Sequence, residues 1–250
     1  MKKLSILFII IVFGLSASAS ATTMYGIWQD TDGDGVKDVH LGNVSAYTGA
    51  ASAYDNMDYY SASVHPINGP APEAHRSKMF MYDNSDGLSL GFFHNIDAGG
   101  NQYWNRVKWD IKISGMSSAF GMSDDGNLTQ SEFKQLDAFN YSGNWNYINN
   151  TDGGMIEDLV ATSSYWEIAI DPSEFGSVRD WGMYSGDGSA INLWNNPASM
   201  PDGLGSNDHY SLGTNAYTTF ITSDAIPEPM TLLLLGAGLV GTGLVRRKRK

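Results

Sequence analysis

The sequence predicts a mainly β protein: a single antiparallel β-sandwich of the jelly-roll type with one short helix, and a further helix at each end of the chain. Three observations support this fold class. Short segments alternate apolar and polar residues with the period of half-buried strands, and Gly-rich turns separate them. The central region, residues 24–226, also contains all 7 Trp, all 13 Tyr and 8 of the 10 Phe, which supply bulk for a core. Short strands without long helices between them favour a sandwich over an alternating β/α fold. Cysteine is absent, so packing or metal, and not disulfides, must stabilise the fold.

The first expected element is a helix within residues 1–21, which have the pattern of a secretory signal peptide. Two lysines form the charged start, an apolar run follows, and small residues precede the expected cleavage after Ala21, or after Ala19. The apolar run is too short for the alternative, a retained membrane helix. Signal peptidase is therefore an expected processing enzyme, and the exported β-sandwich domain is predicted to comprise residues 22–226.

Strands are predicted along the exported domain wherever the alternation is clear. Lys78–Tyr82 and Leu88–Phe93 are predicted as two strands, joined by a loop that closes at Gly87 and suits a hairpin. Val107–Ile113 alternates strictly, with apolar side chains on one face and charged ones on the other. Four more strands are expected, at Tyr165–Ile170, Trp181–Tyr184, His209–Leu212 and Tyr217–Ile221.

The short helix is predicted from a capping box. Thr129–Glu132 fits the box, and Phe133 and Leu136 continue at helical spacing. Two segments with little periodicity, 46–60 and 140–154, are predicted to be loops.

Two of the predicted strands, within Val107–Gly115 and Tyr165–Gly176, resemble strands of family-nine-like carbohydrate-binding and DOMON-like sandwiches. In these families a Trp-Glu-Ile-Ala-Ile type of strand precedes a short turn led by Pro, as it does here from Trp166. The resemblance implies a jelly-roll sandwich and glycan binding, without identifying the residues that contact sugar.

The C-terminal segment, residues 227–250, combines three features. It begins with the triplet Pro227, Glu228 and Pro229. Sixteen uncharged residues follow at 230–245, and a basic cluster follows at 246–250. As a helix the uncharged run reaches about 24 Å, which is marginal against a bilayer core of about 30 Å. We expect a transmembrane helix over 230–245 with the basic cluster in the cytoplasm, which places the preceding domain beyond the inner membrane.

These three features, in this order, resemble the PEP-CTERM sorting tail of Gram-negative bacteria. The resemblance is confined to the tail. It implies processing by an exosortase, a membrane transpeptidase with a catalytic cysteine, which removes the helix and passes the protein to the cell envelope or extracellular matrix. Proteins with such tails often come from organisms that make exopolysaccharide. The alternative is an ordinary tail anchor with a coincidental Pro-Glu-Pro.

Charge is segregated along the chain. The whole chain has a formal charge of −12, but residues 24–226 hold 8 basic and 26 acidic residues, a net charge of −18. A domain this acidic is repelled by phosphate backbones, so we expect no nucleic-acid partner.

An Asp-rich loop after residue 29 predicts a structural Ca²⁺ site. Carboxylates at positions 1, 3, 5 and 9 and a carbonyl at position 7 of a tight loop suit Ca²⁺, which takes six to eight oxygen ligands. The predicted ligands are Asp30, Asp32, Asp34, the Val36 carbonyl and Asp38. Lys37 and Leu41 depart from the EF-hand pattern, so the loop more closely resembles those of thrombospondin type 3 and dockerin segments. The alternative is an acidic surface turn.

A second, weaker candidate calcium loop contains Asp125, Asn127 and Glu132, which align with positions 5, 7 and 12 of an EF-hand loop. Its first carboxylates are missing, because Gly121 and Ser123 stand at positions 1 and 3. A capped helix alone explains Glu132, and we favour that interpretation.

Tryptophans flanked by Asn are the candidate glycan-binding residues. Aromatic rings stack on sugar rings while amides bond to hydroxyls, and Trp104, Trp145 and Trp194 have such neighbours. The alternative for each ring is core packing.

No catalytic site can be assigned from the sequence. It contains no His-Glu-x-x-His and no Cys nucleophile, and among 26 acidic residues a glycosidase pair cannot be selected. The sequence therefore predicts a non-enzymatic envelope or matrix protein, stabilised by Ca²⁺, with exopolysaccharide as a candidate partner. The alternatives are a secreted polysaccharide hydrolase and a purely structural matrix component.

Overall fold

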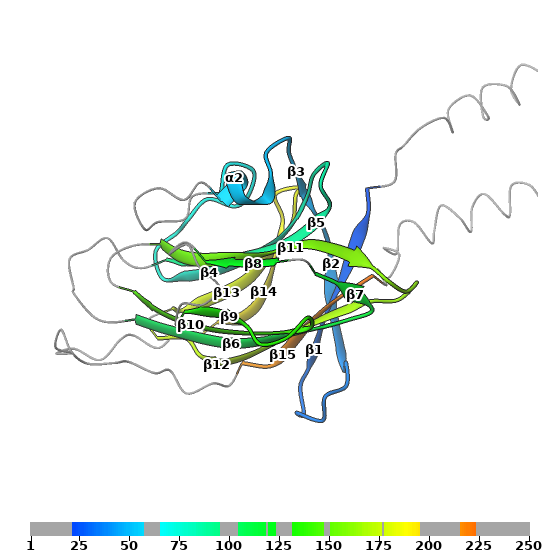
Figure 1. Ribbon diagram of the computed structural model, residues 1–250. Helices are drawn as coiled ribbons and strands as arrows, with labels where there is room; N and C mark the ends of the chain where they lie inside the picture. Colours follow the sequence, from blue (N-terminus) through cyan, green and yellow to red (C-terminus); the bar gives the residue numbers. More distant parts are fainter. Residues whose placement is uncertain are drawn as a thin grey trace, which may run out of the picture.

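The computed structural model describes residues 22–57, 66–95, 105–118, 120–123, 132–147, 151–176, 178–195 and 216–223. They form two sheets stacked face to face, as Figure 1 shows, and one short helix. The predicted β-sandwich is thus confirmed. No helix in these ranges is long and apolar enough to cross a membrane. The signal helix predicted in 1–21, the transmembrane helix at 230–245 and the strand at 209–212 lie outside them.

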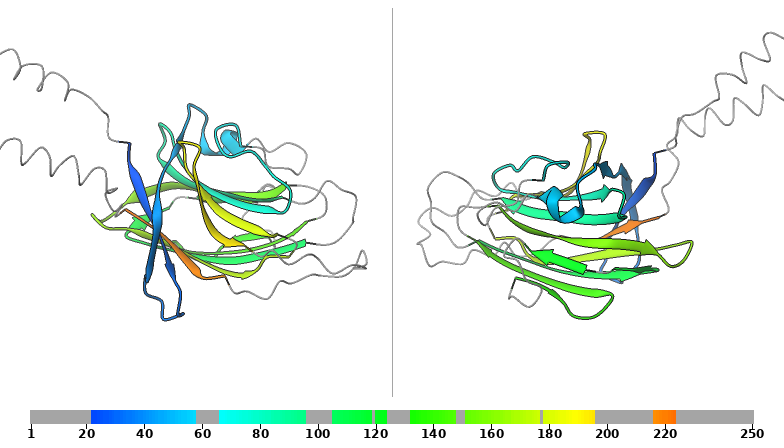
Figure 2. Two further views of the ribbon diagram at one scale, coloured as in Figure 1. Left: turned by 180° about the vertical axis from the view of Figure 1, so that it is seen from behind. Right: turned by 45° about the horizontal axis from the view of Figure 1, so that its top comes forward.

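The first sheet has seven strands in the order β2-β1-β15-β12-β6-β10-β9, all antiparallel. Its strands are β1 (Met24–Asp30), β2 (Val39–Ser45), β6 (Asn105–Ser114), β9 (Phe133–Gln135), β10 (Asn140–Tyr147), β12 (Glu167–Glu174) and β15 (Thr218–Thr222). Figure 2 shows the β1–β2 hairpin at one edge of the sandwich, where its loop projects beyond the sheets.

The second sheet has eight strands, with β14-β13-β4-β5-β11-β7 as its main path, β3 beside β4 and β8 beside β11. Its strands are β3 (Tyr47–Thr48), β4 (Arg76–Asp83), β5 (Leu88–Asn95), β7 (Met116–Ser117), β8 (Phe120–Ser123), β11 (Thr151–Ala161), β13 (Asp180–Tyr184) and β14 (Ala190–Asn195). β4 pairs parallel to both β3 and β13, so this sheet is mixed, where only antiparallel pairing was expected.

The main core lies between the two sheets. The alternation predicted for β6 is observed: Trp109 and Ile111 are buried, and Asp110 between them is exposed. From the opposite sheet, Met79 and Met81 of β4 enter the same core. Burying such side chains contributes about 1.5–3 kcal/mol each, which makes this interface the main source of stability.

A second apolar cluster covers the outer face of the eight-stranded sheet. Phe80 and Tyr82 alternate with the core-facing residues of β4 and pack with Met57 of α2 (Ala53–Met57), which lies over this sheet in Figure 1. Ser52 directly precedes the helix, and its hydroxyl accepts from the Asp55 N–H at 3.1 Å and donates to the Asp55 carboxylate at 2.8 Å. These bonds cap the first turn.

Three expectations about individual elements are wrong. Segment 46–60, predicted as a loop, contains β3 and α2, and segment 140–154 contains β10 and the start of β11. The helix predicted from the capping box is absent from residues 132–139, because Phe133–Gln135 forms β9 and pairs with β10. Phe133 is fully buried, whereas Leu136 is 63% exposed and makes no helical apolar face with it. The strands predicted in β4, β5, β6, β12, β13 and β15 are confirmed.

Candidate metal loop and sorting tail

The Asp-rich loop connects β1 to β2 at the tip of a hairpin. Asp30 is the last residue of β1, and the Asp38 N–H donates to the Gln29 carbonyl at 2.9 Å, which closes the loop. Gly33 and Gly35 have φ values of 82° and 83°. Such left-handed conformations favour glycine, so the two Asp-Gly steps allow the chain to turn tightly here.

The loop wraps its backbone around the Asp30 carboxylate, which is only 3% exposed. Asp30 Oδ1 accepts from the Gly33 N–H at 2.7 Å, and Oδ2 accepts from the Gly35 N–H at 2.7 Å. At the other end, Asp38 Oδ2 accepts from the backbone N–H and the hydroxyl of Thr31, at 2.7 and 2.8 Å. Both carboxylates are therefore held in fixed positions.

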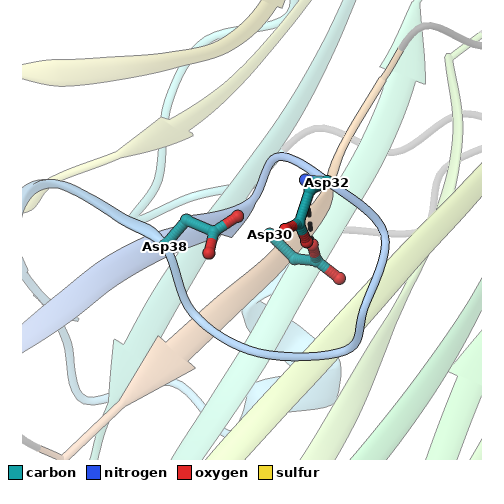
Figure 3. A group of neighbouring side chains, drawn as sticks. All are labelled: Asp30, Asp32 and Asp38. Carbon is teal, nitrogen blue, oxygen red and sulfur yellow. Dashed lines mark hydrogen bonds between the residues drawn. The ribbon is translucent and has the colours of Figure 1, made fainter.

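Three of the five predicted Ca²⁺ ligands come together. One carboxylate oxygen from each of Asp30, Asp32 and Asp38 lies within 4.8 Å of the others. Figure 3 shows these three side chains in the loop. Asp34 is not in this group; its Oδ1 accepts from the Val36 N–H at 2.8 Å. The residues fit a hard cation that prefers oxygen ligands, but three carboxylates form only part of a six- to eight-ligand shell.

Electrostatics in the loop favour a cation. Desolvation raises the pKa of Asp30, but backbone N–H bonds, led by that of Gly35, outweigh it and hold the pKa below its usual range. For Asp32 the Asp34 N–H lowers the pKa, but the charges of Asp34, Asp38 and Asp30 prevail and raise it. The raised pKa reports a negative potential in the loop, which a divalent cation would relieve.

Lys37 fixes the loop to the seven-stranded sheet. Its ammonium donates to Tyr165 Oη and to Glu167 Oε2, and it lies 4.8 Å from the centre of the Tyr165 ring. Desolvation lowers the pKa of Lys37, but the bonds to Glu167 and Tyr165 outweigh it and raise the pKa. The sequence showed Lys37 only as a departure from the EF-hand pattern, because its partners are more than a hundred residues away.

The second calcium loop is only partly within the described residues, which include Glu132 but not Asp125 or Asn127. Glu132 directly precedes β9, and its carbonyl accepts from the Asn144 N–H of β10. Its backbone therefore belongs to the sheet edge and not to a capped helix.

The predicted glycan-binding tryptophans have different surroundings. Trp145 is fully buried in the main core and stacks on Phe133 at 5.6 Å between ring centres, as the alternative of core packing predicts. Trp194 is partly buried in β14 and stacks on Phe175 at 4.6 Å. Trp104 lies outside the described residues.

A family model described as the PEP-CTERM protein-sorting motif matches residues 225–250. The tail recognised from Pro227, Glu228 and Pro229 is thereby confirmed, although its geometry lies outside the described residues. Neither the search of curated proteins nor that of solved structures found a match, so the likeness of β6 and β12 to carbohydrate-binding strands is not confirmed. The chain carries the PEP-CTERM motif of exosortase substrates, which marks it for export to the cell envelope or surface of a Gram-negative bacterium.

Proposed function

We propose that this protein is a non-enzymatic component of the cell envelope or extracellular matrix, whose β1–β2 loop binds structural Ca²⁺ and whose ligand is an exopolysaccharide. The PEP-CTERM motif supports the exported, exosortase-sorted part of this function. The observation that carries the calcium part is the convergence of the Asp30, Asp32 and Asp38 carboxylates within 4.8 Å.

Calcium would act on the stability of the hairpin. Bound at the loop, it would be held by Asp30, Asp32 and Asp38 and would neutralise part of a domain with a net charge of −18. Because β1 lies between β2 and β15, tightening this loop would stabilise one side of the seven-stranded sheet.

A serine–histidine contact in the core is a poor candidate for a hydrolase site. Ser77 Oγ contacts His94 Nδ1, and the neighbouring strand places Asp152 opposite His94. The three residues are at most 4% exposed, and Ser77 and His94 have no exposed surface. A substrate would not reach the Ser77 hydroxyl. These three residues are therefore of the types found in a hydrolase triad, but they are not accessible as a triad must be.

The calcium proposal is tested by melting the exported protein in calcium and in chelator. A ligand that binds only the folded state stabilises by about 2.7 kcal/mol at a hundred times its Kd, so calcium should raise the Tm by several degrees. The D32N/D38N variant should lose this response. D86N, which changes an exposed Asp-Gly turn between β4 and β5, should keep it. Identical melting of the parent protein in both buffers would show the calcium proposal to be wrong.

A further inference from the structure

The two outer faces of the sandwich differ. α2 and the second apolar cluster cover the eight-stranded sheet. On the seven-stranded sheet, Asp110 and Lys112 of β6 and Asp171 of β12 are exposed on the outer face. The described residues that surround them form hollows and not a second core.

Two hollows adjoin on this open face, because Asp171 and Thr218 line both. The first hollow extends from Asp171 and Thr218 to the β1–β2 loop. The second extends from the same two residues across β6 to the residues before β10. We name the combined surface the acidic groove; its charged and aromatic lining includes Asp30, Asp32, Asp110, Asp137, Asp171 and Tyr217. Lys112 is the one basic residue among the described residues that line it.

A like-charge pair lies at the centre of the groove. Asp110 and Asp171 are directly opposite each other on β6 and β12. Facing carboxylates destabilise a sheet. Here the Thr218 hydroxyl donates to Asp171 at 3.2 Å. A locally unfavourable pair on an open face is typical of a binding surface.

The lysines that flank the groove interact with other residues. Lys108 lies 3.6 Å from the Glu174 carboxylate, and Lys37 pairs with Glu167. Lys112, two residues from Asp110 on the same face of β6, offsets part of the negative charge, but the groove lining still holds five aspartates against this one lysine. Electrostatic complementarity therefore favours a ligand that carries positive charge.

We propose that the acidic groove binds an extended polysaccharide of amino sugars with free amino groups. Carboxylates accept hydrogen bonds from ammonium and hydroxyl groups, and the ring of Tyr217, which is 45% exposed, offers a face for a sugar. The groove lies on a sheet face, where backbone groups of β6, β12 and β15 already pair with one another, so a peptide backbone would not gain the hydrogen bonds that a sheet edge offers. This inference rests on the proposed function for its choice of an exopolysaccharide ligand, but it does not require calcium.

The test is calorimetric titration of the exported protein with a glucosamine oligomer, with the N-acetylated oligomer and oligolysine as comparisons. We expect the glucosamine oligomer to bind, the acetylated oligomer to bind at least tenfold more weakly, and D110N/D171N to lose about tenfold in affinity. D110N/D171N should also melt at a higher temperature than the parent, because it removes the facing charges. If Asp110 and Asp171 had only a structural role, their substitution would lower the Tm instead.

The outcomes separate this inference from the calcium proposal. D38N removes a metal ligand that does not line the groove, so it should lose the calcium response and retain glucosamine binding. D110N/D171N should show the reverse. Equal binding of both glucosamine oligomers, or unchanged binding by D110N/D171N, would overturn the inference, and tighter binding of oligolysine would assign the groove to basic peptides.

Discussion

At the residue scale, His94 shows what the core requires of a titratable side chain. Its imidazole has no exposed surface and packs 4.7 Å, between ring centres, from both Trp109 and Trp145. Burial disfavours the charged form and lowers the pKa of His94 to about 3. The residue is therefore neutral in the folded protein near neutral pH.

The lowered pKa predicts a loss of stability in mild acid. Below its ordinary pKa of about 6.5 the unfolded state binds a proton that the folded state does not, so stability falls as pH falls from 6.5 towards 3. Between pH 6.5 and 5, above the range of most carboxylates, the folding equilibrium should weaken by up to about tenfold per pH unit. The urea concentration at the midpoint of unfolding should fall for the parent as the pH is lowered across this range. It should fall less steeply for H94F, which keeps an aromatic ring. The same slope in both proteins would contradict this assignment.

At the element scale, the β1–β2 loop depends on glycine for its conformation. Gly35 has a φ of 83° and open space where a Cβ would stand, and Gly188 in the β13–β14 turn has a φ of 87° and equally open space. Alanine at either site meets backbone strain without a clash, so G35A and G188A should each cost about 1–2 kcal/mol in urea unfolding.

Calcium should distinguish the two alanine variants. The Gly35 N–H donates to the Asp30 carboxylate, so altering the conformation of Gly35 would displace a proposed calcium ligand. G35A should therefore need a higher calcium concentration for the same gain in Tm, whereas G188A should respond like the parent. If both variants respond identically, Gly35 contributes only to the turn.

Elements were predictable where local pattern and tertiary pairing agree. β6 alternates clearly because one face meets the core and the other is charged. β10 was missed because its inner residues include Gly143 beside Trp145, and its outer residues are Asn and Ser, a composition typical of loops. The capping box failed because pairing of Phe133 opposite Gly143 overrides local helix propensity.

The convergence of carboxylates in the β1–β2 loop was largely predictable because these residues are close in sequence. Spacing alone indicated Asp30, Asp32 and Asp38, although it could not show that Asp34 stays outside the close group. The acidic groove was not predictable, since Asp110 and Asp171 become neighbours only through pairing of strands 61 residues apart.

At the scale of the whole molecule, the sorting tail follows a strand inside the sheet. β15 lies between β1 and β12 and ends at Thr222, five positions before Pro227. The seven-stranded sheet therefore includes the last described strand of the chain, and every strand described precedes the sorting motif. Loss of the tail would remove none of these strands.

This arrangement predicts that processing changes mass but not stability. The motif implies processing by an exosortase, and we expect this processing to remove the tail. The intact mass of protein released from the surface of an exosortase-positive host should then lack residues 230–250. The released protein and a precursor retained by substituting Pro227 and Pro229 with Ala should melt within a few degrees of each other, since cleavage leaves β15 and its pairs with β1 and β12 intact. Recovery of surface protein that still contains residues 230–250 would show that the tail acts as a permanent anchor. A large drop in Tm on processing would show that the tail stabilises the domain directly.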